Sequence, residues 1–116
     1  MGLTRVAVLS TRSLFAEGIA SQLRRHLDTI DLRSVDCQQR DAMAQIAAFQ
    51  PAVVIVDASD PDIDARCPLS DLLQTFPSLK VIRVDPQDQQ VQVLTSERRT
   101  AGTVDDLVGL IAEPGP

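Results

Sequence analysis

The sequence predicts an α/β fold built on a mostly parallel β-sheet. Short apolar runs alternate with segments whose apolar residues recur every three or four positions, which are the patterns of buried strands and of amphipathic helices. The run from Ala52 to Val56 is continuously apolar, as in a strand buried on both faces of a parallel sheet, and it ends in Asp57. Such alternation favours βαβ units with right-handed crossovers.

The first half of the chain contains three expected strands and two expected helices. Phe15, Ile19 and Leu23 form an apolar stripe on the first helix, and Gly18 would let that helix approach a strand closely. Pro51 ends the second helix. The expected elements are, in order, strand Arg5–Leu9, helix Ser13–Leu27, the more exposed strand Ile30–Val35, helix Asp41–Gln50 and strand Ala52–Asp57.

The second half begins with a polar loop and breaks the alternation once. Only the five residues 86–90 separate two strand-like runs, too few for a parallel crossover, so these runs should pair as an antiparallel hairpin. The expected elements are loop Ala58–Pro68, helix Pro68–Phe76, strand Leu79–Val84, strand Val91–Ser96, the charged edge residues Glu97–Arg99, a last helix Thr103–Ala112 capped by Thr103, and a loose tail Glu113–Pro116.

Length, charge and cysteine usage exclude several classes of function. The 116 residues fit a single domain, residues 1–116, and no apolar run approaches the ~20 residues of a membrane span. The net charge of −5, with basic residues no more than paired, argues against nucleic-acid binding. The isolated Cys37 and Cys67 and the single His26 favour neither a metal centre nor a catalytic Cys/His pair, and they suit a reducing cytoplasm.

The loop after Asp57 is strongly acidic and has two interpretations. The spacing of Asp60, Asp62 and Asp64 resembles that of an EF-hand calcium loop, but Ala65 occupies the position that needs glycine and Asp71 the position of the bidentate glutamate. A solvated acidic loop is the favoured interpretation, and its charge would repel anions or attract a basic partner.

Nucleotide binding and hydrolase chemistry find no support in the first loop. Residues 10–13 contain no glycine, although a phosphate-binding turn after the first strand needs it. Ser10 and Ser13 have no histidine partner nearby, because His26 lies at the far end of the first helix.

Two local segments and the order of elements resemble the receiver domain of two-component response regulators. Ser13–Ile19 is similar to the start of the first helix in receivers attached to DNA-binding domains, and Pro51–Asp57 is similar to the strand that presents the phospho-acceptor aspartate. The resemblance implies a flavodoxin-like three-layer sandwich with five strands in the order 2-1-3-4-5. Here the last strand would be antiparallel and the fourth helix of the family would be missing.

The resemblance places Asp57 at the phospho-acceptor position, but the residues that assist it differ. The family has two acidic residues where this chain has Ser10 and Thr11, a Ser or Thr near Asp85, and a Lys near Thr95 and Ser96, where this chain has none. Phosphoryl transfer to a carboxylate needs Mg²⁺ and a cation to neutralise crowded oxygens, and Asp85 would instead add a like charge. We therefore expect a degenerate receiver that is not an enzyme and holds neither metal nor cofactor.

A missing fourth helix would leave one face of the hairpin over residues 79–96 uncovered. We expect a non-catalytic signalling or assembly module that binds a protein partner or a second copy through the hairpin, at Val81 (or Ile82, depending on register), Val91, Val93 and Leu94. One alternative is a switch in which Asp57 still accepts a phosphoryl group. The other is a small-ligand sensor with a pocket of Ser10, Thr11, Asp57 and Asp85.

Overall fold

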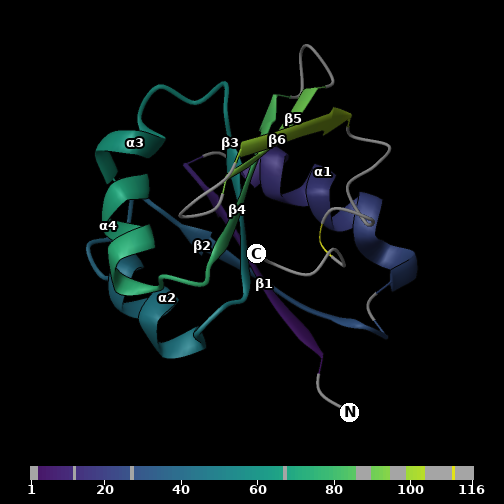
Figure 1. Ribbon diagram of the computed structural model, residues 1–116, viewed down its shortest axis with the longest axis horizontal. Helices are drawn as coiled ribbons and strands as arrows, with labels where there is room; N and C mark the ends of the chain where they lie inside the picture. The colour runs from purple at the N-terminus through teal and green to yellow at the C-terminus, as the bar shows by residue number, and fades with distance from the viewer. Residues whose placement is uncertain are drawn as a thin grey trace.

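One mixed β-sheet organises the chain (Figure 1). The computed structural model describes residues 3–11, 13–26, 28–66, 68–85, 90–94, 99–103 and 111. The strands are β1 (Thr4–Ser10), β2 (Ile30–Asp36), β3 (Val53–Asp57), β4 (Lys80–Asp85), β5 (Gln90–Leu94) and β6 (Arg99–Thr103). The helices are α1 (Ser13–Leu23), followed by the 3₁₀ turn η1 (Arg24–His26), and α2 (Ala42–Phe49), α3 (Ile63–Arg66) and α4 (Leu69–Thr75).

The strand order confirms the predicted topology of the first five strands. The order is β2-β1-β3-β4-β5-β6, in which β2, β1, β3 and β4 run parallel and β5 runs antiparallel to β4. Only residues 86–89 lie between β4 and β5, and so short a connection cannot return the chain for a parallel pairing. Counting residues in the sequence was sufficient to predict this hairpin.

The end of the chain differs from the prediction, because the sheet has a sixth strand. β6 pairs antiparallel with β5, with Arg99 opposite Leu94, so β5 is not an edge strand and the prediction that Arg99 guards its edge is wrong. Glu97 and Arg98, the other two residues of that prediction, lie outside the described part of the chain. Only residues 95–98 connect β5 to β6, and so short a connection favours a second antiparallel hairpin. Thr103 ends β6. Of the predicted last helix, residues 104–110 and 112 lie outside the described part of the chain, and Ile111 is helical and buried.

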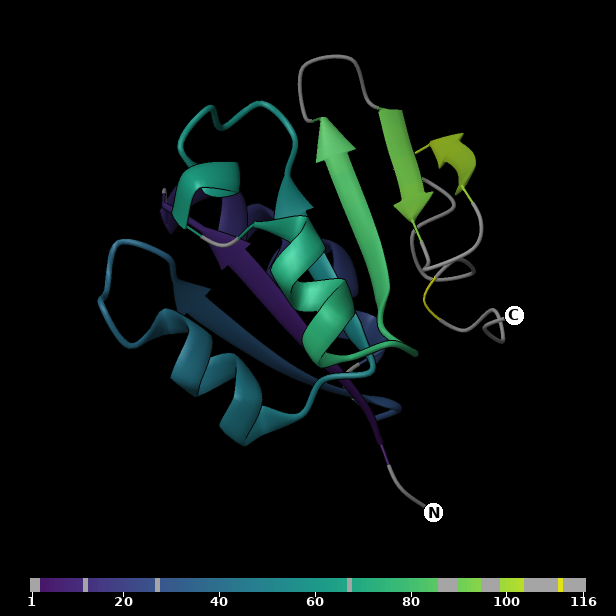
Figure 2. The same ribbon diagram turned by 60° about the vertical axis from the view of Figure 1, so that its left-hand side comes forward.

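Two hydrophobic clusters lie on the two faces of the sheet. One joins the predicted stripe of α1 to alternate residues of the strands, and the other joins α2 and α4 to the remaining strand residues. Figure 2 shows α2 and α4 in front of the sheet and α1 behind it. Every residue of β3 is buried, because this central strand meets both clusters. The two-sided burial inferred for Ala52–Val56 is therefore confirmed from Val53 onward.

The predicted exposure of the β4–β5 hairpin is wrong. Val81, Val91 and Val93 are at most 4% exposed, and the side chain of Leu94 lies outside the described part of the chain. Val91 and Val93 pack in the same cluster as Phe15 of α1 and Ile111, so the chain itself covers this face. Val81 packs in the opposite cluster with residues of α4 and the strands. The hairpin side chains that the structure describes thus offer no uncovered apolar surface of the kind on which an interface there would depend.

The segment between β3 and α4 is more ordered than the predicted loop. Residues 63–66 form the short helix α3, and the buried side chain of Ile63 anchors it in the cluster that contains α2 and α4. The backbone N–H of Ile63 donates to the carbonyl of Asp60 (3.4 Å) at the start of this helix. Within the described ranges, no helix combines the length and apolar character needed to cross a bilayer.

Gln50 adopts a left-handed backbone conformation at the end of α2. Its φ is 52°, and its N–H donates to the carbonyl of Ile46 (3.0 Å), which closes the helix. Glycine tolerates this conformation without the steric cost that a Cβ brings. We therefore expect Gln50→Gly to raise the free energy of unfolding by about 0.5–1 kcal/mol. Gln50→Ala, which keeps the Cβ, should give no gain, and equal urea midpoints for the two variants would contradict the argument.

Candidate functional site

The carboxyl edge of the parallel strands gathers the polar residues singled out in the sequence. Ser10 ends β1, Asp57 ends β3 and Asp85 ends β4. The register places Leu9 opposite Val56 and Asp57 opposite Val84, so these ends lie at neighbouring positions of the sheet. Ligands of open α/β sheets bind at this edge. The structure therefore groups Ser10, Asp57 and Asp85 at the carboxyl edge as predicted.

The carboxylate of Asp57 is fully buried and accepts hydrogen bonds from the loop that follows it. Asp57 is 0% exposed, and its Oδ1 accepts hydrogen bonds from the backbone N–H (2.9 Å) and the hydroxyl (2.6 Å) of Ser59. The N–H of Ala58 donates to the carbonyl of Val84 (2.8 Å), which fixes the start of the loop on β4. A buried carboxylate needs such donors because it has lost its hydration.

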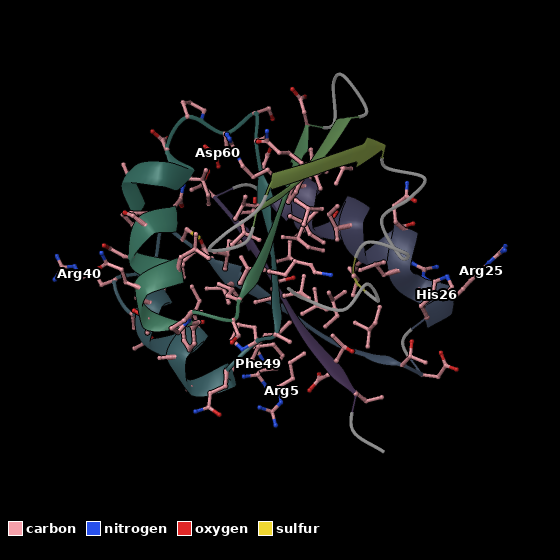
Figure 3. All side chains as sticks on the ribbon, viewed as in Figure 1. Arg5, Arg25, His26, Arg40, Phe49 and Asp60 are labelled. Atoms are coloured by element: carbon pink, nitrogen blue, oxygen red, sulfur yellow. The ribbon has the colours of Figure 1, made fainter. Side chains whose placement is uncertain are left out.

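Asp60 ties the loop after β3 to the loop after β1. Its side chain is 6% exposed, and Oδ2 accepts hydrogen bonds from the backbone N–H (3.3 Å) and the hydroxyl of Thr11. Its Oδ1 accepts a hydrogen bond from the backbone N–H of Asp62 (3.0 Å). Figure 3 shows Asp60 in the loop above the ends of the strands. We refer to these bonds between residues 11 and 60 as the Thr11–Asp60 contact.

These residues form a satisfied polar cluster. Among the described residues, no buried side-chain nitrogen or oxygen lacks a hydrogen-bond partner. Ser10 is buried, and its backbone carbonyl accepts from the N–H of Cys37 (3.0 Å), whereas Asp85 is half-buried. Two hydroxyl residues, Ser10 at the end of β1 and Thr11 directly after it, therefore stand at the place where the resemblance implied carboxylates, while Asp60 brings a carboxylate in from another loop.

The acidic residues after Asp57 do not converge as calcium ligands would. Asp60 is directed to Thr11, Asp62 is exposed, and Asp71 is exposed on the first turn of α4. The loop becomes the helix α3 at Ile63, so the extended ligand-bearing loop of an EF-hand does not form. Within the described ranges, no group of three or more His, Cys, Asp or Glu side chains is arranged to hold a metal ion.

Ser59 and the anchoring role of Asp60 were not recognised in the sequence. Each lies in a turn where an aspartate side chain accepts a hydrogen bond from the backbone N–H two residues later. Asp57 accepts in this way from Ser59, and Asp60 accepts from Asp62. Asp36 does the same with Gln38 (2.9 Å) at the end of β2. Because aspartate often forms such Asx turns, these aspartates are a local signal that would have predicted the turns. The bond from Asp60 to Thr11 spans 49 positions and has no local signal.

Comparison with protein-family models, with curated proteins and with solved structures returns no match to this chain.

Proposed function

We propose that the chain is a degenerate receiver-like module of two-component signalling, with the flavodoxin-like three-layer arrangement, which acts by protein contact without Mg²⁺-dependent phosphorylation. The order of the first five strands and the placement of Asp57 at the end of β3 support the family resemblance, whereas the antiparallel β5 and β6 depart from the family's sheet. The separation of α1 from α2 and α4 into two clusters supports the layered arrangement.

The enclosure of Asp57 is the observation that carries the proposal. A phosphoryl donor must approach a carboxylate oxygen in line, with the metal and the attacking oxygen at the same site. Asp57 is 0% exposed, and its Oδ1 receives two hydrogen bonds from Ser59. Because the Thr11–Asp60 contact also joins the two loops at this edge, a donor would have to displace both sets of bonds.

The charges that phosphoryl transfer requires are also placed unfavourably. Mg²⁺ prefers carboxylate oxygens, but β1 ends in Ser10 and is followed by Thr11, which both carry hydroxyl groups. Lys80, the only lysine of the chain, begins β4 opposite Val53, whereas Asp57 lies opposite Val84 at the other end of the strand. Four residues of strand separate these positions by about 13 Å, beyond the contact distance for a charge that steadies the phosphoryl group.

Beryllofluoride with Mg²⁺ tests this proposal, because it mimics an aspartyl phosphate only where the metal and the carboxylate can both be reached. We expect titration of the full chain to leave the backbone amide signals of residues 57–60 unchanged. Incubation with acetyl phosphate should leave the intact mass unchanged. The Asp57→Asn variant, titrated in parallel, identifies any signal change that arises elsewhere in the chain.

A saturable shift at residues 57–60 that Asp57→Asn abolishes would overturn the proposal. It would show instead a phospho-accepting switch, in which the loop after β3 opens to admit the donor. A phosphoryl adduct lost in Asp57→Asn would have the same meaning.

A further inference from the structure

The outer face of α1 carries the most exposed large apolar side chain among the described residues. Leu14 is 80% exposed, and the only other exposed large apolar side chain in the described ranges is Leu3, at 48%. Phe15, Ile19 and Leu23 fill the buried side of the same helix. Leu14 therefore lies on the side turned away from the sheet, where the described residues do not cover it.

Four exposed residues form one stripe along this face. Leu14, Gly18, Ser21 and Arg25 are spaced by four, three and four positions, which places them on the same side of the helix and its 3₁₀ end. Figure 3 shows Arg25 projecting away from the sheet. We call these four residues the α1 stripe.

Gly18 is not explained by packing within the chain. A Cβ placed on it would meet no atom within 4 Å, so the expected close approach of this glycine to a strand is wrong. Glycine inside a helix costs about 1 kcal/mol relative to alanine. A glycine that the chain's own packing does not require, set beside Ser21 on the exposed stripe, would let a second helix approach closely.

The charges beside the stripe specify which helix fits. Glu17 and Arg24 are both exposed and lie on the same flank, two turns apart. In a parallel two-fold pairing with a second copy, the flank that carries Glu17 and Arg24 lies on opposite sides of the interface in the two copies, so these charges cannot meet. In an antiparallel pairing centred on Ala20 the same flanks face each other, so Glu17 of each copy lies beside Arg24 of the other, and each Leu14 lies near the aliphatic stem of the opposite Arg25.

We propose that two copies of this chain associate through the α1 stripe in an antiparallel, two-fold arrangement. This inference rests on the proposed function, in which the chain acts by contact, and it moves the contact surface from the buried β4–β5 hairpin to α1. A single helix pair buries less than the roughly 1,200 Å² of a standard interface, so we expect dissociation at about 0.1 mM.

Sedimentation of the full chain at concentrations up to about 1 mM tests the pairing. Each of two charge-reversal variants should weaken association by itself, and a mixture of the two variants should restore it. Glu17→Arg alone brings two guanidinium groups together across the interface, and Arg24→Glu alone brings two carboxylates together. We expect each single variant to lose at least about tenfold in association constant. An equimolar mixture of the two variants should regain the association. In the mixed dimer one copy carries arginine at both positions and the other carries glutamate at both, so each contact between the copies joins opposite charges.

Ala48→Arg, on the exposed side of α2, serves as the helix-surface control and should associate like the parent chain. A parent chain that stays monomeric, single variants that associate normally, or a mixture that fails to recover would each overturn the inference. These failures would leave the beryllofluoride result unaffected, so the dimer and the proposed function are tested separately.

Discussion

Asp60→Ala is expected to lower the free energy of unfolding by about 2 kcal/mol, although the residue lies in a loop and its replacement removes a buried charge. The carboxylate accepts bonds from two groups of Thr11 and from the N–H of Asp62, and its side chain is 6% exposed. Alanine would leave these donors without their acceptor at the point where the loops after β1 and β3 meet. Urea unfolding followed by circular dichroism measures the loss.

Two further variants separate the parts of this effect. Asp60→Asn keeps the Oδ1 that accepts from Asp62 but turns an amide toward the donors of Thr11, so we expect an intermediate loss. Thr11→Val removes the hydroxyl alone. In the double-mutant cycle of Asp60→Ala and Thr11→Val, we expect a coupling of about 1 kcal/mol. Additive effects of the two substitutions would show that the hydroxyl bond of the Thr11–Asp60 contact does not stabilise the fold.

The sequence predicted the central part of the fold because the information there is local. The run Val53–Val56 is apolar throughout, and its burial on both faces follows from composition alone. The direction of β5 followed from the length of the connection after Asp85. The strand order 2-1-3-4-5 was expected only from the resemblance to receiver domains, and the order of β1 to β5 agrees with it.

The sequence did not predict β6 because residues 99–103 are not typical of a strand. Arg, Ala and Gly occupy three of its five positions, and only two threonines favour strand structure. The strand forms because it pairs with β5 over its whole length, which is a tertiary effect. The expected exposure of Val91 and Val93 failed for a related reason. It was inferred from the family's missing helix, whereas α1 and Ile111 share the cluster of these two residues.

The sequence predicted where the candidate site lies but not which of its residues are joined by hydrogen bonds. Asp57, Ser10 and Asp85 lie at the ends of strands, so their proximity follows from topology. The pairing of Asp60 with Thr11 joins two loops 49 positions apart, and sequence spacing cannot reveal it. The full burial of Asp57, like that contact, became known only from the structure.

The largest effect is expected for Leu72→Ala in α4. Leu72 is 0% exposed and packs in the cluster that joins α2 and α4 to the sheet, with Leu79 and Val81 among its members. Removing its branched end leaves a cavity as well as losing the transfer energy of the side chain. We expect a loss of about 3 kcal/mol in the free energy of unfolding, measured as a lower urea midpoint with an unchanged slope.

Leu14→Ala is the matched control, because it makes the same chemical change at a residue that is 80% exposed. Its free energy of unfolding should stay within about 0.5 kcal/mol of the parent chain when measured at low concentration. At high concentration it should weaken self-association, since the lost side chain belongs to the α1 stripe. A large loss of monomer stability in Leu14→Ala would show that Leu14 is covered within the chain, which would contradict its place on a free surface. Leu72→Ala and Leu14→Ala thus distinguish a leucine that holds the fold together from one that is available to a second copy.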